Sequence, residues 1–441
     1  MNKKIYIHTL GCPKNDADSE AMANVLENDG FELCFEPELA DIILINTCCF
    51  VNDAKEESVE AILSACELKE NNPSLKVAVC GCLAQRYAEE LKEEIPEADY
   101  FIGTGEIANI AKILTSDKPV YLNDINAPID EAGRLTLYDA PYAYVKISEG
   151  CDKNCTYCII PKLKGKHRSR KMEDILAEVE TLANEEGRSE IIFVAQDTGA
   201  YGTDLYGKRM LGELILKAAE IEGVKWIRLL YVYPEEVDDE LIYAYKNCDK
   251  LLKYIDIPLQ HINDRILKLM NRRTSRADIE ALIKKLRDEV PEIAIRSSFI
   301  AGFATETEEE VEELAEFLRE AKLTRAGVFA YSLEEGTPAE KMSGHIPEEE
   351  KIRRRNMLME TQMEVSSEVL SSFVGKTLEV LIESMEEDGL FGGRSYLDSP
   401  DIDGIVYAYS DDVLEMNEYY KVKITDSTEY DLWGEVINEN Q

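Results

Sequence analysis

Positive charge is scarce in this chain of 441 residues. It has 49 lysines and arginines against 88 aspartates and glutamates, which gives a formal net charge of −39. A field of this sign repels phosphate backbones and attracts cationic partners. Nucleic acid is therefore a poor first expectation for the partner.

Long apolar runs are also missing. No stretch approaches the roughly 18 apolar residues that indicate a membrane helix, and the first eight residues lack the apolar core of a secretion signal. We therefore expect no membrane contact and a cytoplasmic location. Because that compartment keeps thiols reduced, clusters among the eleven cysteines predict metal binding or catalysis rather than disulfides.

The composition is that of a folded protein, with 45% hydrophobic and 31% charged residues. At roughly 150 residues per domain, the length predicts two or three domains. Up to about residue 115, short apolar runs alternate with helical patterns, with strands expected at residues 4–9, 42–46 and 76–80 and helices at 19–28 and 54–69. This alternation predicts a parallel sheet covered by helices.

Three cysteines each follow one of these strands: Cys12, Cys48 and Cys82. Since ligands collect at the carboxyl ends of parallel strands, the three should converge on one edge. Each precedes an expected helix, whose N-terminal partial charge favours the thiolate. Three thiolates on separate loops suit an iron–sulfur cluster with one iron left without a protein ligand. Spacing does not separate Cys48 from its neighbour Cys49.

The remaining cysteines of the sheet region are expected to be structural. Cys80 ends an apolar run and should point into the sheet layers. Cys34, Cys66 and Cys248 are interpreted as buried small hydrophobic residues.

A second trio lies in one tight loop after an expected strand at residues 142–148. Cys151, Cys155 and Cys158 have the spacing C-x3-C-x2-C, which can reach three corners of a cube-shaped cluster. A structural zinc site is the alternative, but zinc normally takes four ligands, and the nearest extra candidate, His167, lies in a basic run. An open iron could bind a small molecule through an amino and a carboxylate group.

The C-x3-C-x2-C loop, with an aromatic residue before its last cysteine, resembles the radical S-adenosylmethionine (SAM) enzymes. The chain after it fits their partial barrel of six strand–helix units, with strands near residues 142–148, 190–196, 226–232, 254–260, 293–302 and 325–332. A three-cysteine domain, this barrel and a small all-β tail together resemble the methylthiotransferases over essentially the whole chain.

The resemblance implies an α/β fold in three parts. These are an N-terminal doubly wound parallel-sheet domain with an auxiliary cluster (residues 1–120), a central partial (β/α)6 radical SAM barrel (135–370) and a small antiparallel TRAM-like β-barrel (371–441). For the tail we expect five short strands in an open barrel.

The motif from Thr9 to Asn15, followed by Asp18, Ser19 and Glu20, is similar to one branch of this family. That branch inserts a methylthio group at the β-carbon of an aspartate in ribosomal protein uS12. The implied partners are uS12, free or in the small subunit, an electron donor such as flavodoxin or ferredoxin, and a sulfur donor. Lys164 departs from the family pattern, where arginine is usual.

The resemblance also implies two [4Fe-4S] clusters and SAM as cofactors. The cluster at Cys151, Cys155 and Cys158 would reduce SAM to a radical that removes hydrogen, and the cluster at Cys12, Cys48 and Cys82 could carry the sulfur. Candidate cofactor contacts are Tyr157, Gln196 and Asp197, although Gln196 could equally be a cap or loop residue. Arg228, inside an apolar strand, is either a structural ion-pair member or a cofactor contact. No side chain is assigned a catalytic role.

The distribution of charge along the chain bears on whether the substrate is a basic protein or RNA. Residues 162–171 include six lysines or arginines and could contact nucleic acid, solvent, or the carboxylates of SAM or substrate. From residue 376 to the end, 4 basic residues face 17 acidic ones, which opposes RNA binding and suits a basic protein. The alternatives are a tRNA (adenosine) methylthiotransferase and an iron–sulfur electron carrier without chemistry of its own.

Overall fold

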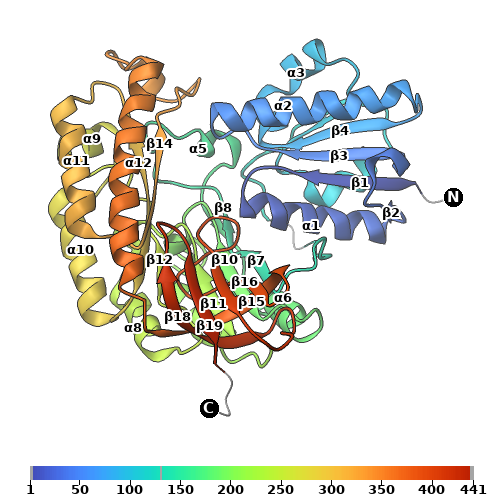
Figure 1. Ribbon diagram of the computed structural model, residues 1–441. Coiled ribbons are helices and arrows are strands. Elements are labelled where there is room, and N and C mark those ends of the chain that lie inside the picture. Colours follow the sequence, from blue (N-terminus) through green and yellow to red (C-terminus); the bar gives the residue numbers. More distant parts are fainter. Residues whose placement is uncertain (1–2, 130–131, 438–441) are drawn as a thin grey trace.

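The computed structural model describes residues 3–129 and 132–437, so the outer bounds of the first and last expected domains lie outside it. Three parts follow one another along the chain (Figure 1). An N-terminal sheet domain sits on one side of a partial barrel, and a small β-barrel packs against that partial barrel near the C-terminus. None of the helices in the described ranges is both long and apolar enough to cross a membrane.

The N-terminal domain is a six-stranded parallel sheet in the order β2-β1-β3-β4-β5-β6. Its strands are β1 (Lys4–Thr9), β2 (Glu32–Leu33), β3 (Ile42–Thr47), β4 (Lys76–Gly81), β5 (Tyr100–Ile102) and β6 (Val120–Tyr121). Its helices are α1 (Pro13–Asn28), α2 (Asn52–Glu67), α3 (Cys82–Glu94) and α4 (Ile110–Ile113). Helices cover both faces of this sheet, so the central strand β3 is buried at every position (Figure 1).

Helix α1 begins earlier than its sequence pattern indicated. We expected it at residue 19, but it starts at Pro13, directly after Cys12. Proline suits the first helical position because its fixed φ is helical and its missing N–H is not needed there. As a result Cys12 itself stands at the N-cap of α1.

Six parallel strands form the partial barrel, in two sheets of three with the orders β11-β10-β7 and β12-β13-β14. They are β7 (Tyr142–Lys146), β10 (Glu190–Val194), β11 (Trp226–Leu229), β12 (Tyr254–Asp256), β13 (Ala294–Ala301) and β14 (Arg325–Ala330). Backbone hydrogen bonds from Leu252 N to Ile227 O (2.9 Å) and from Val232 N to Asp256 O (2.9 Å) join the two sheets. The six expected strands are therefore present as one curved surface.

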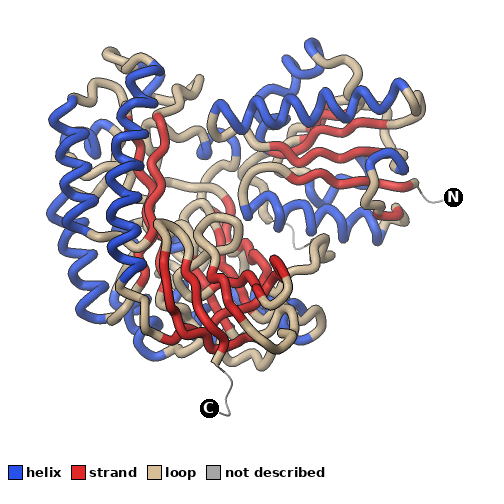
Figure 2. The backbone as a smooth tube through the Cα atoms, viewed as in Figure 1, coloured by secondary structure: helices blue, strands red, loops and turns tan. Residues whose placement is uncertain are grey.

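Helices lie on the outer side of this surface (Figure 2). They are α6 (Met172–Asn184), α7 (Leu211–Ala218), α8 (Asp239–Asn247), α9 (Asp264–Leu269), α10 (Arg276–Glu289), α11 (Glu308–Ala321) and α12 (Glu348–Ser371). Three short elements, β8 (Ser148–Glu149), α5 (Ile160–Leu163) and β9 (Arg168–Ser169), belong to the segment around the second cysteine trio.

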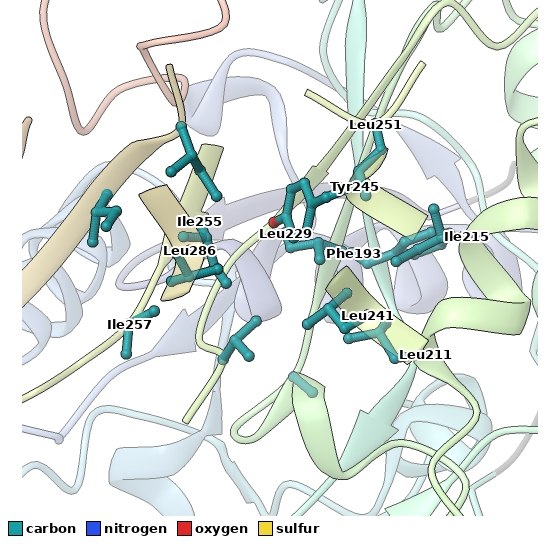
Figure 3. Close-up of a cluster of buried hydrophobic side chains, with 14 of the residues drawn as sticks. Phe193, Leu211, Ile215, Leu229, Leu241, Tyr245, Leu251, Ile255, Ile257 and Leu286 are labelled. Carbon is teal, nitrogen blue, oxygen red and sulfur yellow. The ribbon is translucent and has the colours of Figure 1, made fainter. Parts of the chain in front are cut away.

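The main hydrophobic core lies between the barrel strands and these helices (Figure 3). Phe193, Leu229 and Ile255, one from each of three neighbouring strands, are fully buried there. Each such side chain contributes about 1.5–3 kcal/mol relative to exposure. Tyr245 from α8 joins the same core and donates its hydroxyl to Tyr254 O at 2.8 Å, so its polar atom is satisfied. This packing fixes the carboxyl ends of the strands.

The C-terminal part is a closed barrel in the order β15-β16-β17-β19-β18. Its strands are β15 (Thr377–Glu387), β16 (Leu390–Arg394), β17 (Val406–Tyr409), β18 (Tyr419–Ser427) and β19 (Leu432–Val436). The expected open barrel was wrong, because β17 and β19 pair with each other in parallel and remove the free edges. The other pairs are antiparallel.

A buried ion-pair group attaches this barrel to the strands of the central part. Arg228 donates from Nε to Glu190 at 2.7 Å, and Arg394 pairs with the other oxygen of Glu190 at 2.7 Å. Arg228 also donates to the backbone oxygen of Tyr396 at 3.0 Å. Burial alone would raise the pKa of Glu190, but Arg394 and Arg228 hold that pKa below its usual range. Arg228 is therefore a structural ion-pair member.

The N-terminal domain meets the central barrel through paired charges. Glu334, which follows β14, contacts Arg86 at 2.6 Å and Lys55 at 3.1 Å. Asp18 of α1 pairs with Lys146 of β7 and, at 3.1 Å, with Lys164. These contacts hold the carboxyl ends of both sheets near one another.

Candidate functional site: two cysteine trios at a domain interface

The loop that carries the second trio has a fixed shape. Gly150, just before Cys151, has a φ of +81°, and a Cβ there would lie 2.1 Å from Lys166 O, so a side chain is excluded. Cys151 N donates to Gly165 O at 3.1 Å, and Cys158 N donates to Cys155 O at 3.0 Å. The backbone thus folds the three cysteines into one compact turn.

Neighbouring elements hold this loop in place. Thr156 donates its backbone N–H to Met270 O at 3.0 Å and its hydroxyl to Leu269 O at 2.7 Å, which ties the loop to the end of α9. Gln196, just beyond β10, accepts from Gly150 N at 2.9 Å and donates to Glu149. Both ends of the Gln196 amide are therefore used to support the loop.

The second trio offers a donor set that suits a cationic cluster. Burial raises the pKa of Cys151 to about 12 and raises that of Cys158 as well, so neither thiol ionises readily without a metal. The Arg272 guanidinium lies 3.9 Å and the Tyr233 hydroxyl 3.8 Å from Cys155 Sγ. Soft sulfur ligands with a cation beside them fit an iron–sulfur cluster, whose thiolate ligands carry negative charge.

The first trio lies at the carboxyl ends of three adjacent strands. Cys12 follows β1 at the N-cap of α1, Cys48 follows β3, and Cys82 opens α3 after β4. Gly11 has a φ of +98°, and a Cβ there would lie 2.7 Å from Cys48 Cβ, so the first two loops approach as closely as glycine permits. The sheet order β1-β3-β4 brings the three loops to one edge.

The expectation that helix N-termini favour thiolates here was wrong for Cys48 and Cys82. Burial raises the pKa of both, and for Cys82 the nearby Cys49, Cys48 and Cys12 raise it further. Lys164 lowers it but does not offset burial. Desolvation outweighs the partial charge of a helix end, so these sulfurs also need a metal to become thiolates.

The two neighbouring cysteines differ in surroundings. Cys48 interacts electrostatically with Cys12, whereas both Cys48 and Cys49 interact with Cys82. The backbone N–H and C=O of Cys48 both bond Ser58 Oγ, at 3.1 and 2.9 Å. Cys49 is fully buried in the N-terminal core, where burial raises its pKa to about 12. A Cβ on Gly11, next to Cys12, would lie 3.1 Å from Cys48 Sγ, and this proximity favours Cys48 as a ligand beside Cys12.

The remaining cysteines of the chain belong to neither trio. Cys80 is buried on the opposite side of β4, with its Sγ 3.9 Å from Met22 Sδ, as its position in the strand indicated. Cys248 is buried, whereas Cys34 and Cys66 are half-buried at the edge of the core, so the expectation of full burial was wrong for those two.

Both trios lie against one short segment beyond β11. Tyr231 contacts Lys14, two residues past Cys12, with Lys14 Nζ 3.5 Å from the centre of its ring. Tyr233 contacts Cys155 of the other trio. Tyr231 and Tyr233 are separated by one residue in the segment after β11. This segment therefore connects the surroundings of one trio with those of the other.

A buried network of ion pairs connects the segments that carry the two trios. Lys146 and Lys164 both pair with Asp18 of the N-terminal domain and with Glu149, two residues before Cys151. Lys164 lies 3.4 Å from Glu149 and is in electrostatic contact with Cys82. At this position, where arginine is usual in the family, Lys164 therefore also supplies a buried cation that is paired with carboxylates.

The basic run is divided between buried, half-buried and exposed positions. Arg170 pairs with Glu178 at 2.7 Å, and Lys162 donates to Gly336 O at 2.5 Å. Lys164 is buried and Arg170 is half-buried and paired, so these two do not form a nucleic-acid surface or a solvated loop. Lys162, Lys166 and Lys171 are exposed.

The expected SAM contacts lie around the second trio. Tyr157 packs beside Cys155 and Arg272. Asp197 is buried, and burial raises its pKa to about 7 although Lys153 lies 3.5 Å away. Within the described residues, Asp197 Oδ1 has no hydrogen-bond partner. Contacts of Tyr157, Gln196 and Asp197 with SAM stay predictions.

Sequence reasoning missed four residues that lie beside the trios: Lys14, Tyr231, Tyr233 and Arg272. Lys14 was part of a recognised motif without a role, and nothing in the local pattern marks Arg272. No group of three or more His, Cys, Asp or Glu side chains in the described ranges has the geometry to hold a metal ion. Ligation by the six cysteines therefore stays a prediction that rests on their donor chemistry and placement.

Three family descriptions match successive parts of the chain. Residues 4–103 match the Uncharacterized protein family UPF0004, residues 145–318 the Radical SAM superfamily and residues 374–437 the TRAM domain. These matches, with the observed sheets and closed barrel, confirm the predicted fold class.

Solved structures share the fold at low sequence identity. The radical SAM methyltransferase TsrM from Kitasatospora setae, with cobalamin and a [4Fe-4S] cluster bound, has a TM-score of 0.55 and 14% identity, over 89% of this chain and 81% of that one. The cobalamin-dependent radical SAM enzyme OxsB has a TM-score of 0.51 and 13% identity, over 81% of this chain and 56% of that one.

Curated relatives match over nearly full length. The ribosomal protein uS12 methylthiotransferase RimO of Clostridioides difficile (strain 630) is 47% identical, over 99% of both chains. The protein of the same name from Lachnoclostridium phytofermentans is 46% identical, over 98% of this chain and 99% of its own. The chain therefore belongs to the family of ribosomal protein uS12 methylthiotransferases named RimO.

Proposed function

We propose that this chain is a radical SAM methylthiotransferase that inserts a methylthio group at the β-carbon of an aspartate in ribosomal protein uS12. The relatives' names support this assignment, and nothing favours the tRNA-modifying alternative. The structural observation that carries it is the segment from Tyr231 to Tyr233, which contacts the surroundings of both cysteine trios.

The reaction needs a strong hydrogen-abstracting agent. The β C–H bond of an aspartate is not acidic enough for a side-chain base whose pKa lies near the working pH. SAM on an iron–sulfur cluster supplies radical chemistry when bound. The residues around Cys155 position that cofactor, since Arg272 and Tyr233 surround the sulfur and Gln196 fixes the loop. The paired charges of Asp18, Lys146 and Lys164 keep the two trios at a fixed separation.

The presence of two cysteine trios supports the proposal of two clusters per chain. The second trio would hold the cluster that binds SAM, and Cys12, Cys48 and Cys82 would hold the auxiliary cluster that takes part in sulfur transfer. An electron donor such as flavodoxin or ferredoxin and a separate sulfur donor complete the proposed reaction. The expected cytoplasmic location follows from the ribosomal substrate.

The ligand choice between Cys48 and Cys49 can be tested with two matched variants. After anaerobic reconstitution, Cys48→Ala should lose about half of the bound iron, because one of two similar clusters would lack a ligand. Cys49→Ala should keep both clusters and lose only core packing. Iron and sulfide analysis with visible absorption spectra would measure this. Retention of all iron by Cys48→Ala together with loss in Cys49→Ala would reverse the assignment.

The substrate is tested by mass spectrometry. The enzyme, incubated anaerobically with SAM, reductant, sulfide and uS12, should add one methylthio group to an aspartate of uS12. Adding salt should weaken the binding of uS12, because the C-terminal barrel region carries 17 acidic and 4 basic residues and the attraction to a basic protein is screened. A methylthio group found on tRNA instead would assign the chain to the other branch. Absence of SAM cleavage under reductant would favour an electron carrier.

A further inference from the structure

Lys14 is a cation without a carboxylate partner at the interface of the two trios. Within the described residues, Lys14 contacts the ring and hydroxyl of Tyr231 and interacts electrostatically with Cys12 and Glu149, but it forms no ion pair with an acidic side chain. The neighbouring interface lysines are all paired: Lys146 and Lys164 with Asp18 and Glu149, and Lys153 with Glu236. A lysine that forms no ion pair with a carboxylate of the described residues is unusual in a chain with a net charge of −39.

The side chain of Lys14 retains capacity for a ligand. An ammonium group has three hydrogen-bond donors, and an aromatic ring below it uses its charge without accepting them all. Lys14 and Tyr231 are both partly exposed, so a ligand can reach them. The pair joins the Cys12 loop of the N-terminal domain to the carboxyl end of β11.

Tyr231 is held in a strained conformation at this point. Its φ is +62°, which is costly for a bulky residue. Its N–H donates to Asp256 Oδ2 at 3.0 Å, and its carbonyl accepts from Thr198 N at 3.1 Å. Asp256 is fixed in turn by Arg296 at 2.8 Å. The surrounding structure thus imposes this backbone, which places the phenol ring under Lys14.

We infer that Lys14, supported by Tyr231, binds the side-chain carboxylate of the substrate aspartate. This inference rests on the proposed function and deepens it. The carbon to be modified is bonded directly to that carboxylate. An ion pair with Lys14, two residues past Cys12, therefore holds this carbon beside the first trio. The segment through Tyr233 leads from there to Cys155 of the second trio.

The charge balance of the protein favours such a site. A carboxylate that approaches this chain meets a strongly negative field and loses its hydration on entering the interface. A fixed cation offsets both costs and discriminates an aspartate from an asparagine, which has the same shape but no charge. The methionine carboxylate of SAM has the same chemistry, so the test must separate the two.

A double-mutant cycle on binding tests the assignment. The probes are uS12 and uS12 in which the aspartate found to be modified by the wild-type enzyme is replaced by asparagine. With reconstituted enzyme, Lys14→Met should weaken binding of unchanged uS12 about tenfold or more, as expected for loss of a charge-assisted hydrogen bond. It should change binding of the asparagine form by less than about twofold, because that form has no charge to lose. Lys14→Arg should restore most of the affinity.

Controls make each outcome decisive. Lys112→Met removes an exposed lysine from α4 of the same domain and should leave both affinities unchanged. Iron content and SAM affinity of Lys14→Met should equal those of the wild type. Equal weakening for both uS12 forms, or a matching loss of SAM affinity, would overturn the inference. Failure of the unchanged enzyme to modify uS12 at all would instead contradict the proposed function.

Discussion

Replacing Cys151 with alanine is expected to abolish reductive cleavage of SAM. The loop around Cys151, Cys155 and Cys158 is a single preformed turn. With one thiolate missing, the cluster loses one of its three protein ligands, and no other cysteine lies in that loop. The measurement is 5′-deoxyadenosine formed from SAM under dithionite, by liquid chromatography, with iron content determined on the same sample.

Cys12→Ala is the matched control for this experiment. It removes a cysteine of the other trio, which is attached to the separate sheet of the N-terminal domain. Cleavage of SAM should therefore continue, while transfer of the methylthio group to uS12 should stop. Undiminished SAM cleavage in Cys151→Ala, or its loss in Cys12→Ala alone, would contradict the roles assigned to the two trios.

Glu190→Gln is expected to weaken the attachment of the C-terminal barrel severely. Glu190 is fully buried and neutralises both Arg228 and Arg394. Removing its charge leaves the buried guanidinium groups of Arg228 and Arg394 with less negative charge beside them. This should lower the free energy of unfolding by about 3–5 kcal/mol. Hydrogen–deuterium exchange at β10 and at residues 395–396 would report this loss as faster exchange, since these backbones face the ion pairs.

Glu383→Gln provides the comparison. Glu383 also pairs with Arg394, at 2.6 Å, but its side chain is 22% exposed. Water can replace much of its charge, so this variant should cost about 1 kcal/mol or less. Similar protection in Glu190→Gln and the wild type would show that the Glu190 group contributes little to the attachment.

The sequence predicted the cysteines of both groups because their positions follow from simple rules. Each of Cys12, Cys48 and Cys82 follows an apolar strand, and parallel strands end on a common edge. The second trio is local, so its spacing alone describes the loop. Two predictions were wrong: α1 starts at Pro13 rather than at residue 19, and the C-terminal barrel is closed rather than open. The start of a helix depends on capping, and closure of a barrel depends on the pairing of distant strands.

Other features depend on contacts between remote segments. Arg228 had two possible roles until the structure placed Glu190 and Tyr396 beside it. Lys164 belonged to a basic run that suggested exposed charge, yet it is buried against Asp18 and Glu149. Local charge patterns do not reveal such pairing, because the partner lies on another element.

The sequence by itself determined which cysteines follow successive strands and which share one loop, because residue type and spacing are local properties. Only the tertiary structure decided that Lys14 contacts Tyr231, that Tyr233 contacts Cys155, and that Cys48 lies against the loop of Cys12. These contacts depend on how two separate sheets are packed together by buried ion pairs. Packing of this kind is set by the summed contacts of the whole chain, and no short segment contains it.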